Sequence, residues 1–369
     1  MKKQIRKPFL FFVFLLVTIF LLNFSSCDTT EPPPPTKSPR DYTWSVDTLG
    51  LPNTFQTLML SIWGSSENDV YSCGHISGNR VGLGDLWHYD GKQWETIDYS
   101  KNLEFRGSLQ AVHGTSDDNV WIVGYKYWQD VHSNEIKIPY IIKYDGARWE
   151  KHEVDTEHGV YGVYVVNEFE TWACGDGGIV YHYKNHRWDL DTIKVPMTEN
   201  DFFIIYSVVQ FNGEVYAIGT NREKYSADTQ YYFFKKESGF WKKMDEIRVV
   251  VSSTRNDITF GNKLIVNREN QLLSYGSYGI YIWKNNSWEK YFPTNYIITS
   301  VFPQSNNNLL AVGDFGIKYH YNGSDWQELN EIDVSDIVYS GVWANNKETF
   351  IVGFKGIGNV QKSLVLHGK

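Results

Sequence analysis

The sequence predicts an all-β fold: a seven-bladed β-propeller of four-stranded antiparallel blades, closed by an N-terminal strand that completes the last blade. Three observations predict it. A tryptophan-containing hairpin motif recurs along the chain, a second motif ending in glycine recurs seven times, and no helical periodicity separates them. Units of roughly 40 to 55 residues that each contain four short strands are typical of propeller blades.

The motif that ends in glycine predicts the two inner strands of each blade. In AVHGTSDDNVWIVG, an apolar run, a polar cluster and an alternating run follow one another, which is the order of two strands around a turn. Its copies end at Gly74, Gly124, Gly175, Gly219, Gly276, Gly313 and Gly353. We therefore expect seven blades.

The tryptophan motif, first seen as LWHYDGKQWE, predicts the two outer strands. Its turns suit two central residues with positive φ. The best candidates are Asp90-Gly91, Asp145-Gly146 and Asn322-Gly323, and weaker ones are Lys184-Asn185, Ser238-Gly239 and Asn285-Asn286. Each tryptophan begins an outer strand, where it can wedge against the neighbouring sheet. We interpret this set as structural: Trp44, Trp94, Trp149, Trp188, Trp241, Trp288 and Trp326.

The two ends of the repeat region predict how the ring closes. The last unit stops at SLVLHGK, where His367-Gly368 occupies the turn position and no outer strand follows. The segment RDYTWSVDTLGLP places Trp44 as Trp94 is placed in the first unit. Pairing of these ends would supply the missing strand and remove an exposed sheet edge.

The N-terminal region predicts export and a lipid anchor. A basic start and an apolar run from Phe9 to Leu22, too short for a comfortable membrane span, predict a signal peptide over residues 1–26. Ser25-Ser26 before Cys27 resembles the lipobox of bacterial lipoproteins, although Phe24 departs from it. The resemblance implies lipidation of Cys27 and a place in the bacterial cell envelope, on the outer membrane or the periplasmic face. The alternative is a plain secretory signal with an incidental cysteine.

The segment after Cys27 predicts a spacer and then the folded body. Four consecutive prolines predict that residues 27–39 form a proline-rich linker, which the expected lipid on Cys27 would anchor. Residues 40–369 have ordinary globular composition and are expected to form the propeller.

Two patterns carry a family resemblance over residues 40–369. W-G-S-x-x-D-V-Y-x-x-G and H-Y-D-G-x-x-W resemble the motifs of bacterial envelope propellers with Asp-box (BNR-like) hairpins and, more distantly, of photosystem II assembly factor propellers. HYDGKQW keeps Asp90, Gly91 and Trp94 of the sialidase Asp box, with His88 in place of its serine. The resemblance implies a fold that several activities share.

Composition and motif spacing argue against several chemistries. A net charge of −8 without a basic patch argues against a nucleic-acid partner. We expect no metal or other cofactor, because His88, His182 and His320 occupy one repeated strand position in non-adjacent blades. We expect Cys73 and Cys174 to be buried free thiols, too far apart for a disulfide. We identify no catalytic residue, since the chain has no G-x-S-x-G elbow.

Unequal repeats indicate a binding face. The distance from repeat glycine to tryptophan is 12 or 13 residues in the third, fifth and sixth units but 20, 25 and 22 in the first, second and fourth. These insertions share one rim, and such insertions often mark the binding side of a repeat protein. The candidate binding residues are Arg80, Tyr125, Tyr127, Trp128, Arg222 and Tyr225.

We therefore expect a lipid-anchored, non-catalytic propeller that binds a glycan or a protein partner through this rim. The alternatives are a sialidase-like glycan hydrolase and a scaffold that assists assembly of another complex. A pair of carboxylates with arginines at the ring centre would favour the hydrolase.

Overall fold

The computed structural model describes residues 37–78, 83–99, 108–129, 135–250, 252–254, 257–305, 308–330, 334, 336–358 and 360–369. In these ranges the regular structure is β-strand, apart from the short 3-10 turns η1 (Pro39–Asp41) and η3 (Asp314–Gly316). No helix in the described part of the chain is long and apolar enough to cross a membrane. The expected signal peptide, Cys27 and most of the linker lie outside the described residues.

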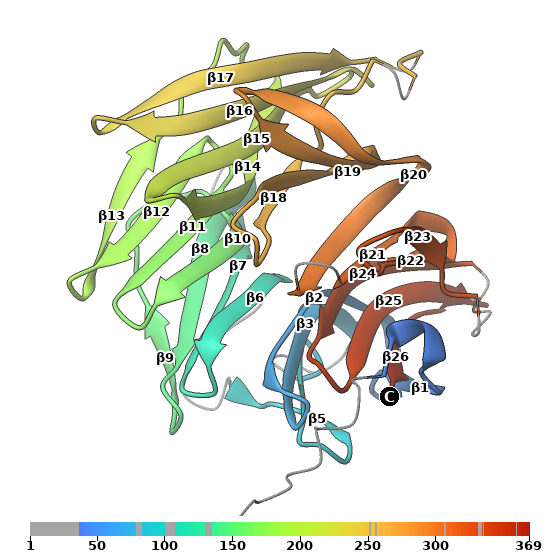
Figure 1. Ribbon diagram of the computed structural model, residues 1–369. Helices are drawn as coiled ribbons and strands as arrows, with labels where there is room; N and C mark the ends of the chain where they lie inside the picture. Colours follow the sequence, from blue (N-terminus) through green and yellow to red (C-terminus); the bar gives the residue numbers. More distant parts are fainter. Residues whose placement is uncertain are drawn as a thin grey trace, which may run out of the picture. The chain divides into compact units, whose positions relative to one another are not determined.

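The strands form an all-β propeller of four-stranded antiparallel blades, whose first strands face a common centre (Figure 1). Three sheets each contain four consecutive strands within the described ranges. The first has β6 (Ser108–Ser116), β7 (Asn119–Gln129), β8 (Glu135–Tyr144) and β9 (Trp149–His152). The second has β10 (Val160–Asn167), β11 (Glu170–Gly175), β12 (Ile179–Lys184) and β13 (Arg187–Thr192). The third has β14 (Asp201–Phe211), β15 (Glu214–Glu223), β16 (Thr229–Glu237) and β17 (Phe240–Val249).

Two larger sheets each join two sets of strands. The eight-stranded sheet has β24 (Ile337–Ala344), β25 (Thr349–Ile357), β26 (Val360–Gly368), β1 (Trp44–Leu49), β2 (Thr54–Ser66), β3 (Asp69–Gly78), β4 (Leu86–Tyr89) and β5 (Trp94–Thr96). Its halves are linked by one parallel pair, Gln56 with Gln361. The six-stranded sheet has β18 (Lys263–Val266), β19 (Leu272–Lys284), β20 (Ser287–Ser305), β21 (Asn308–Gly313), β22 (Lys318–Tyr321) and β23 (Trp326–Glu328).

The N-terminal strand lies beside the C-terminal residues, as the sequence predicts. β1 pairs antiparallel with β26, with Trp44 opposite Gly368 and Leu49 opposite Ser363. The pairing extends beyond both strands, because Thr43 and Lys369 exchange two backbone hydrogen bonds of 2.9 and 3.1 Å. The ends of residues 37–369 are therefore held together by a continuous ladder.

The repeated tryptophans are half-buried at the starts of outer strands, and several of them contact the preceding set of strands. The Trp188 ring lies 5.5 Å from that of Trp121 in an edge-to-face arrangement. Equivalent edge contacts of 6.1 Å join Trp149 to Tyr71 and Trp94 to Phe350. These rings fill the widening gap between sheets that diverge from a common centre.

The outer hairpin turns differ from the predicted geometry. At Asp90-Gly91 only the glycine has positive φ, at 91°, and the Asp90 Oδ1 instead accepts hydrogen bonds of 2.9 Å from the backbone N–H groups of Lys92 and Gln93. Asp145 and Asn322 cap their turns in the same way. The prediction of positive φ at both central positions was wrong here, because an Asp or Asn side chain can organise a turn by itself. It holds for two of the weaker candidates, Ser238-Gly239 and Asn285-Asn286.

Side-chain hydrogen bonds join several neighbouring inner strands. The Ser61 Oγ on β2 accepts a bond of 3.2 Å from Val112 N on β6. The Ser340 Oγ on β24 donates a bond of 2.6 Å to Met59 O on β2. Similar bonds run from β10 to β6, β14 to β18 and β24 to β20. Neighbouring blades are thus connected where they are closest together.

The histidines that recur on third strands form one repeated local contact. The Nε2 of each lies within hydrogen-bond distance of a polar side chain at the start of the adjacent second strand. The pairs are His88 with Asp69 at 2.7 Å, His182 with Glu170 at 2.9 Å, His320 with Asn308 at 2.8 Å, and His367 with Glu348 at 2.6 Å. This contact accounts for the histidine repeat by structure alone.

The Trp188 contact yields a stability prediction. Trp188→Ala would leave a cavity against the fully buried Trp121, and we expect it to lower the free energy of unfolding by about 3 kcal/mol or more. Phe240→Ala is the control, because Phe240 is 79% exposed and its loss should change stability by less than about 0.5 kcal/mol. Urea unfolding measures both, and a loss of under about 1 kcal/mol for Trp188→Ala would contradict the wedge role.

Candidate functional site

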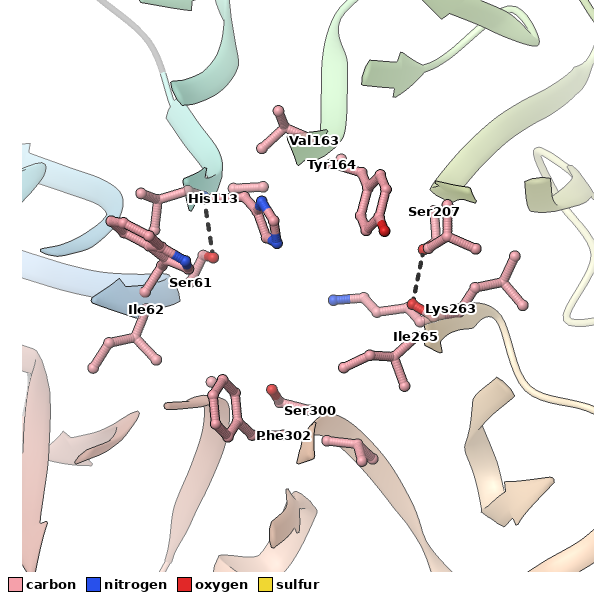
Figure 2. A pocket seen from close by; sticks show the side chains of 18 of the residues that line it. Ser61, Ile62, His113, Val163, Tyr164, Ser207, Lys263, Ile265, Ser300 and Phe302 are labelled. Carbon is pink, nitrogen blue, oxygen red and sulfur yellow. Dashed lines mark hydrogen bonds between the residues drawn. The ribbon is translucent and has the colours of Figure 1, made fainter. Parts of the chain in front are cut away.

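The inner strands surround a central cavity of about 400 Å³. Its walls come from β2, β6, β10, β14, β18, β20 and β24, and Figure 2 shows side chains from several of them around the opening. Among the described residues that line it, the charged ones are Lys263 and Arg268, and neither aspartate nor glutamate is present. The remaining lining is largely aliphatic, aromatic and hydroxyl.

A tyrosine–lysine cluster lies at one end of this cavity and is made by Tyr125, Tyr127, Lys137, Tyr161 and Asp176. Tyr161 belongs to the cavity wall, and its ring lies 5.2 Å from that of Tyr125. The Lys137 Nζ donates to Tyr161 OH at 2.7 Å and to Asp176 Oδ2 at 3.2 Å. It also lies 5.2 Å from the centre of the Tyr125 ring. The cluster therefore connects the β7–β8 hairpin to the next blade.

Two phenols of this cluster, those of Tyr125 and Tyr161, are neutral hydrogen-bonding groups. Burial, followed by the hydrogen bond with Tyr127, raises the pKa of Tyr125 far above its usual value. Burial, followed by the nearby Asp176 carboxylate, raises the pKa of Tyr161 in the same way. Both hydroxyls keep their protons at physiological pH and can donate or accept hydrogen bonds.

The structure does not gather all of the predicted rim residues into one exposed patch. Tyr127 is 51% exposed and Tyr225 is 82% exposed, whereas Tyr125 is only 8% exposed and packs inside the tyrosine–lysine cluster. Arg222 is exposed, and its Nε donates to Ser226 O of its own hairpin at 3.0 Å. Arg80 and the side chain of Trp128 lie outside the described residues.

The described residues of the insertion between β7 and β8 are strand. We expected Tyr125, Tyr127 and Trp128 on a loop, but all three lie in β7, where Tyr125 pairs with Pro139 and Tyr127 with Lys137. Tyr125 and Tyr127 are two residues apart on one side of a strand, which brings their rings within 5.1 Å. The added residues thus extend the β7–β8 hairpin.

The sequence alone did not identify several residues of the site. Lys137, Tyr161 and Asp176 were not singled out, because their meeting depends on how one blade packs against the next. Lys263 and His113 were missed because they lie in the short inner strands, which were read only as packing elements. A lysine in the otherwise apolar run KLIV was the one signal that could have identified Lys263.

Hydrolytic chemistry finds little support in this geometry. Asp176 is bound by Lys137 and lies 3.3 Å from His158 Nδ1, but it does not line the cavity, and neither does any other carboxylate of the described residues. The described residues contain no group of three or more His, Cys, Asp or Glu side chains that could hold a metal ion. Cys73 and Cys174 are buried free thiols, and burial raises the pKa of each.

Solved structures show the same fold. The structure of YCF48 bound to D1 peptide is 14% identical with a TM-score of 0.57, over 88% of this chain and 96% of that one. YCF48 from Cyanidioschyzon merolae is 16% identical with a TM-score of 0.54, over 86% and 98%. The WD40 β-propeller domain of Doa1 is 13% identical with a TM-score of 0.52, over 89% and 96%. No protein-family model matches the chain, and no curated protein does.

The chain is therefore an all-β propeller, and the expected likeness to photosystem II assembly factor propellers is confirmed at the level of fold. Its site is a central cavity without acidic lining among the described residues, joined at one end to a tyrosine–lysine cluster.

His113, in the cavity wall, yields a prediction about acid stability. Burial lowers the pKa of His113 to about 4, so the unfolded chain binds this proton more tightly than the folded one. The neutral His113 side chain makes its full contribution to the free energy of unfolding above pH 6.5, and this contribution is lost as the pH falls toward 4. His113→Asn keeps an acceptor for the N–H of Val165 and should reduce the stability lost between pH 7 and 4.5 by about 2 kcal/mol.

The comparison requires urea unfolding at both pH values. Part of the acid dependence should persist in the variant, because burial and Arg40 lower the pKa of His320 to about 4 as well. Equal losses in wild type and His113→Asn would show that His113 does not supply this dependence.

Proposed function

We propose that this protein is a non-catalytic scaffold of the bacterial cell envelope that binds a protein partner through its hairpin face. This face is the end of the propeller that carries the turns β3–β4, β7–β8 and β15–β16. The observation that carries the proposal is the tyrosine–lysine cluster, of which Tyr127 is exposed, together with the exposed Tyr225 between β15 and β16. Exposed tyrosines on a rigid strand framework suit protein recognition, because they add contact area at little entropic cost.

The proposal takes the ring to have seven blades closed by β1. Seven inner strands contribute to the cavity wall, which supports this count. The pairing of β1 with β26 supplies the strand that the last unit lacks. Division of the eight-stranded sheet at its single parallel pair leaves two sets of four strands. The six-stranded sheet gives two such sets when β19 is divided between its pairings with β18 and β20, and β20 between its pairings with β19 and β21.

The proposal also places the propeller on a membrane through a lipid at Cys27, after removal of residues 1–26. The support is the sequence pattern around Ser25-Ser26-Cys27. Two or more acyl chains would hold the protein firmly at a bilayer, and the proline-rich linker of residues 27–39 would act as a semi-rigid spacer. A partner in the envelope would therefore meet the propeller near a membrane surface.

A protein partner is favoured over a glycan by the nature of the contacts. The Lys137 ammonium and neutral phenols offer donors for backbone carbonyls, and YCF48, which has the same fold, is known bound to a peptide. A glycan remains the second candidate, because the exposed Tyr225 ring could stack on a sugar. The sialidase-like alternative lacks support, since Asp-box-type hairpins lie on the outer strands and no acid lines the described cavity wall.

The test is a double variant, Tyr127→Ala with Tyr225→Ala, expressed as the full chain. We expect it to lose the envelope proteins that cross-link to the wild type, because both exposed rings of the hairpin face are removed. The matched control is Phe169→Ala with Phe240→Ala, whose rings are 62% and 79% exposed at the opposite end, in the β10–β11 and β16–β17 turns.

Cross-linked partners identified by mass spectrometry are compared across the three proteins. Equal recovery with the hairpin-face variant would overturn the proposed face. A glycan array run in parallel decides the second candidate, since saturable glycan binding that Tyr225→Ala abolishes would replace the protein partner with a sugar.

A further inference from the structure

Lys263 occupies a position at which the other inner strands have a small residue. In six inner strands, the residue that pairs with the one before the repeat glycine is serine, alanine or glycine. These residues are Ser61, Ala111, Gly162, Ser207, Ser300 and Gly341. In β18 the equivalent residue is Lys263, which pairs with Tyr275 before Gly276. Packing alone therefore does not account for a long cationic side chain here.

The backbone of β18 also differs from its equivalents. Each of the other six strands has a register shift directly before the small residue, whereas β18 begins at Lys263 without one. Such irregularities redirect side chains. Figure 2 shows the Lys263 side chain pointing into the cavity.

The Lys263 ammonium has no compensating charge in the described part of the chain. No hydrogen bond or ion pair to its Nζ is formed there, and no carboxylate lines the cavity there. Burial lowers the pKa of Lys263, and the one nearby group that opposes this is Cys174, whose own pKa burial raises so that it remains a neutral thiol. The Lys263 side chain is half-buried, and an unpaired ammonium that is partly removed from water is costly unless a ligand or solvent compensates it.

Two further donors face the same cavity. His113 Nδ1 accepts a hydrogen bond of 3.1 Å from Val165 N, so the neutral ring carries its proton on Nε2. The Tyr164 ring lies 5.5 Å from His113, and its hydroxyl makes no hydrogen bond among the described residues. Figure 2 shows both side chains at the opening that Lys263 enters. Lys263 supplies a positive charge, His113 and Tyr164 supply neutral donors, and the exposed Arg268 is the second cation of the described lining, which contains no acid. This set of donors suits an anionic ligand.

We propose that the central cavity is a binding site for a single carboxylate group, paired with the Lys263 ammonium and accepting further hydrogen bonds from His113 and Tyr164. A carboxylate has two oxygens that can accept these donors together. The cavity of about 400 Å³ admits a small organic acid or the end of one polypeptide segment. This site goes beyond the hairpin face and does not depend on it.

Acetate is the first probe, with the purified full chain. The unfolding midpoint of the wild type should rise saturably in sodium acetate relative to sodium chloride of equal ionic strength. Lys263→Met keeps the length and removes the charge, and it should weaken acetate binding by about tenfold or more. Without acetate, its unfolding midpoint at neutral pH should equal or exceed that of the wild type, because an uncompensated charge is gone.

Lys284→Met is the matched control, because Lys284 is exposed in the same sheet. It should respond to acetate as the wild type does. An equal response from Lys263→Met would overturn the proposal, as would a wild type that acetate does not stabilise more than chloride does.

The source of the carboxylate is distinguished with alanine tripeptides. Binding of acetate alone indicates a free small acid, and preferential binding of the tripeptide acid indicates a polypeptide terminus. Equal binding of the tripeptide acid and its amide would overturn the proposal. The Tyr127 and Tyr225 double variant should retain these responses, so failure of the hairpin face and failure of the cavity site are distinguishable.

A measurement on the wild type covers the case in which Lys263→Met fails to fold. Lysine side-chain amines are labelled for nuclear magnetic resonance and titrated with and without saturating acetate. The lysine that titrates at the lowest pH should move to higher pH, because a paired carboxylate favours the ammonium. Acetate affinity should also fall as the pH rises through that titration. The absence of any lysine response would overturn the proposal.

Discussion

Crowding between neighbouring inner strands is the constraint on which the rest of this structure depends. A Cβ at Gly162 would lie 2.7 Å from Tyr206 O of the next blade, and one at Gly341 would lie 2.9 Å from Ile62 Cγ2. The inner strands can approach this closely only because small residues occupy one register position in nearly every blade. Serine is the most useful of these residues, since its hydroxyl also bonds the neighbouring backbone, as Ser61 does with Val112. Close approach of the inner strands in turn fixes the size of the central cavity.

The same geometry explains why the outer positions are aromatic. Sheets that nearly touch at the centre diverge outward, and the gap between them is filled by larger side chains as the distance grows. Trp188 against Trp121 and Trp149 against Tyr71 occupy the outer part of that gap. Packing in this gap accounts for the repeated tryptophans in a chain with 16% aromatic residues. The proposed recognition face lies instead at the ends of strands such as β7, where Tyr127 is exposed.

The sequence predicts features of the fold that depend on neighbouring residues in the chain, such as turns. It predicts fewer of the features that depend on how strands pair and how blades pack. Turn residues and the tryptophan spacing located the outer hairpins, and the likeness of the Trp44 segment to that of Trp94 located the strand beside β26. The turn geometry at Asp90 was missed, because an aspartate side chain can replace a backbone conformation. Tyr125 was expected at an exposed rim, but it is buried by Tyr161, a residue of another blade. Lys263 differs from its six equivalents only once all seven strands are aligned by their pairing partners.

Two lysines, Lys137 next to the cavity-wall residue Tyr161 and Lys263 in the cavity wall, show how differently one charge can be used. Lys137 is fully partnered: Tyr161 and Asp176 accept its hydrogen bonds, and it contributes to the structure of the tyrosine–lysine cluster. Lys263 lies in a protein of net charge −8, yet no carboxylate among the described residues approaches it. The chain has many acidic side chains, but none of the described ones lines the cavity, so the cavity is cationic. Inner strands that approach one another through serines and glycines have no structural need for that charge, and this supports the proposed ligand.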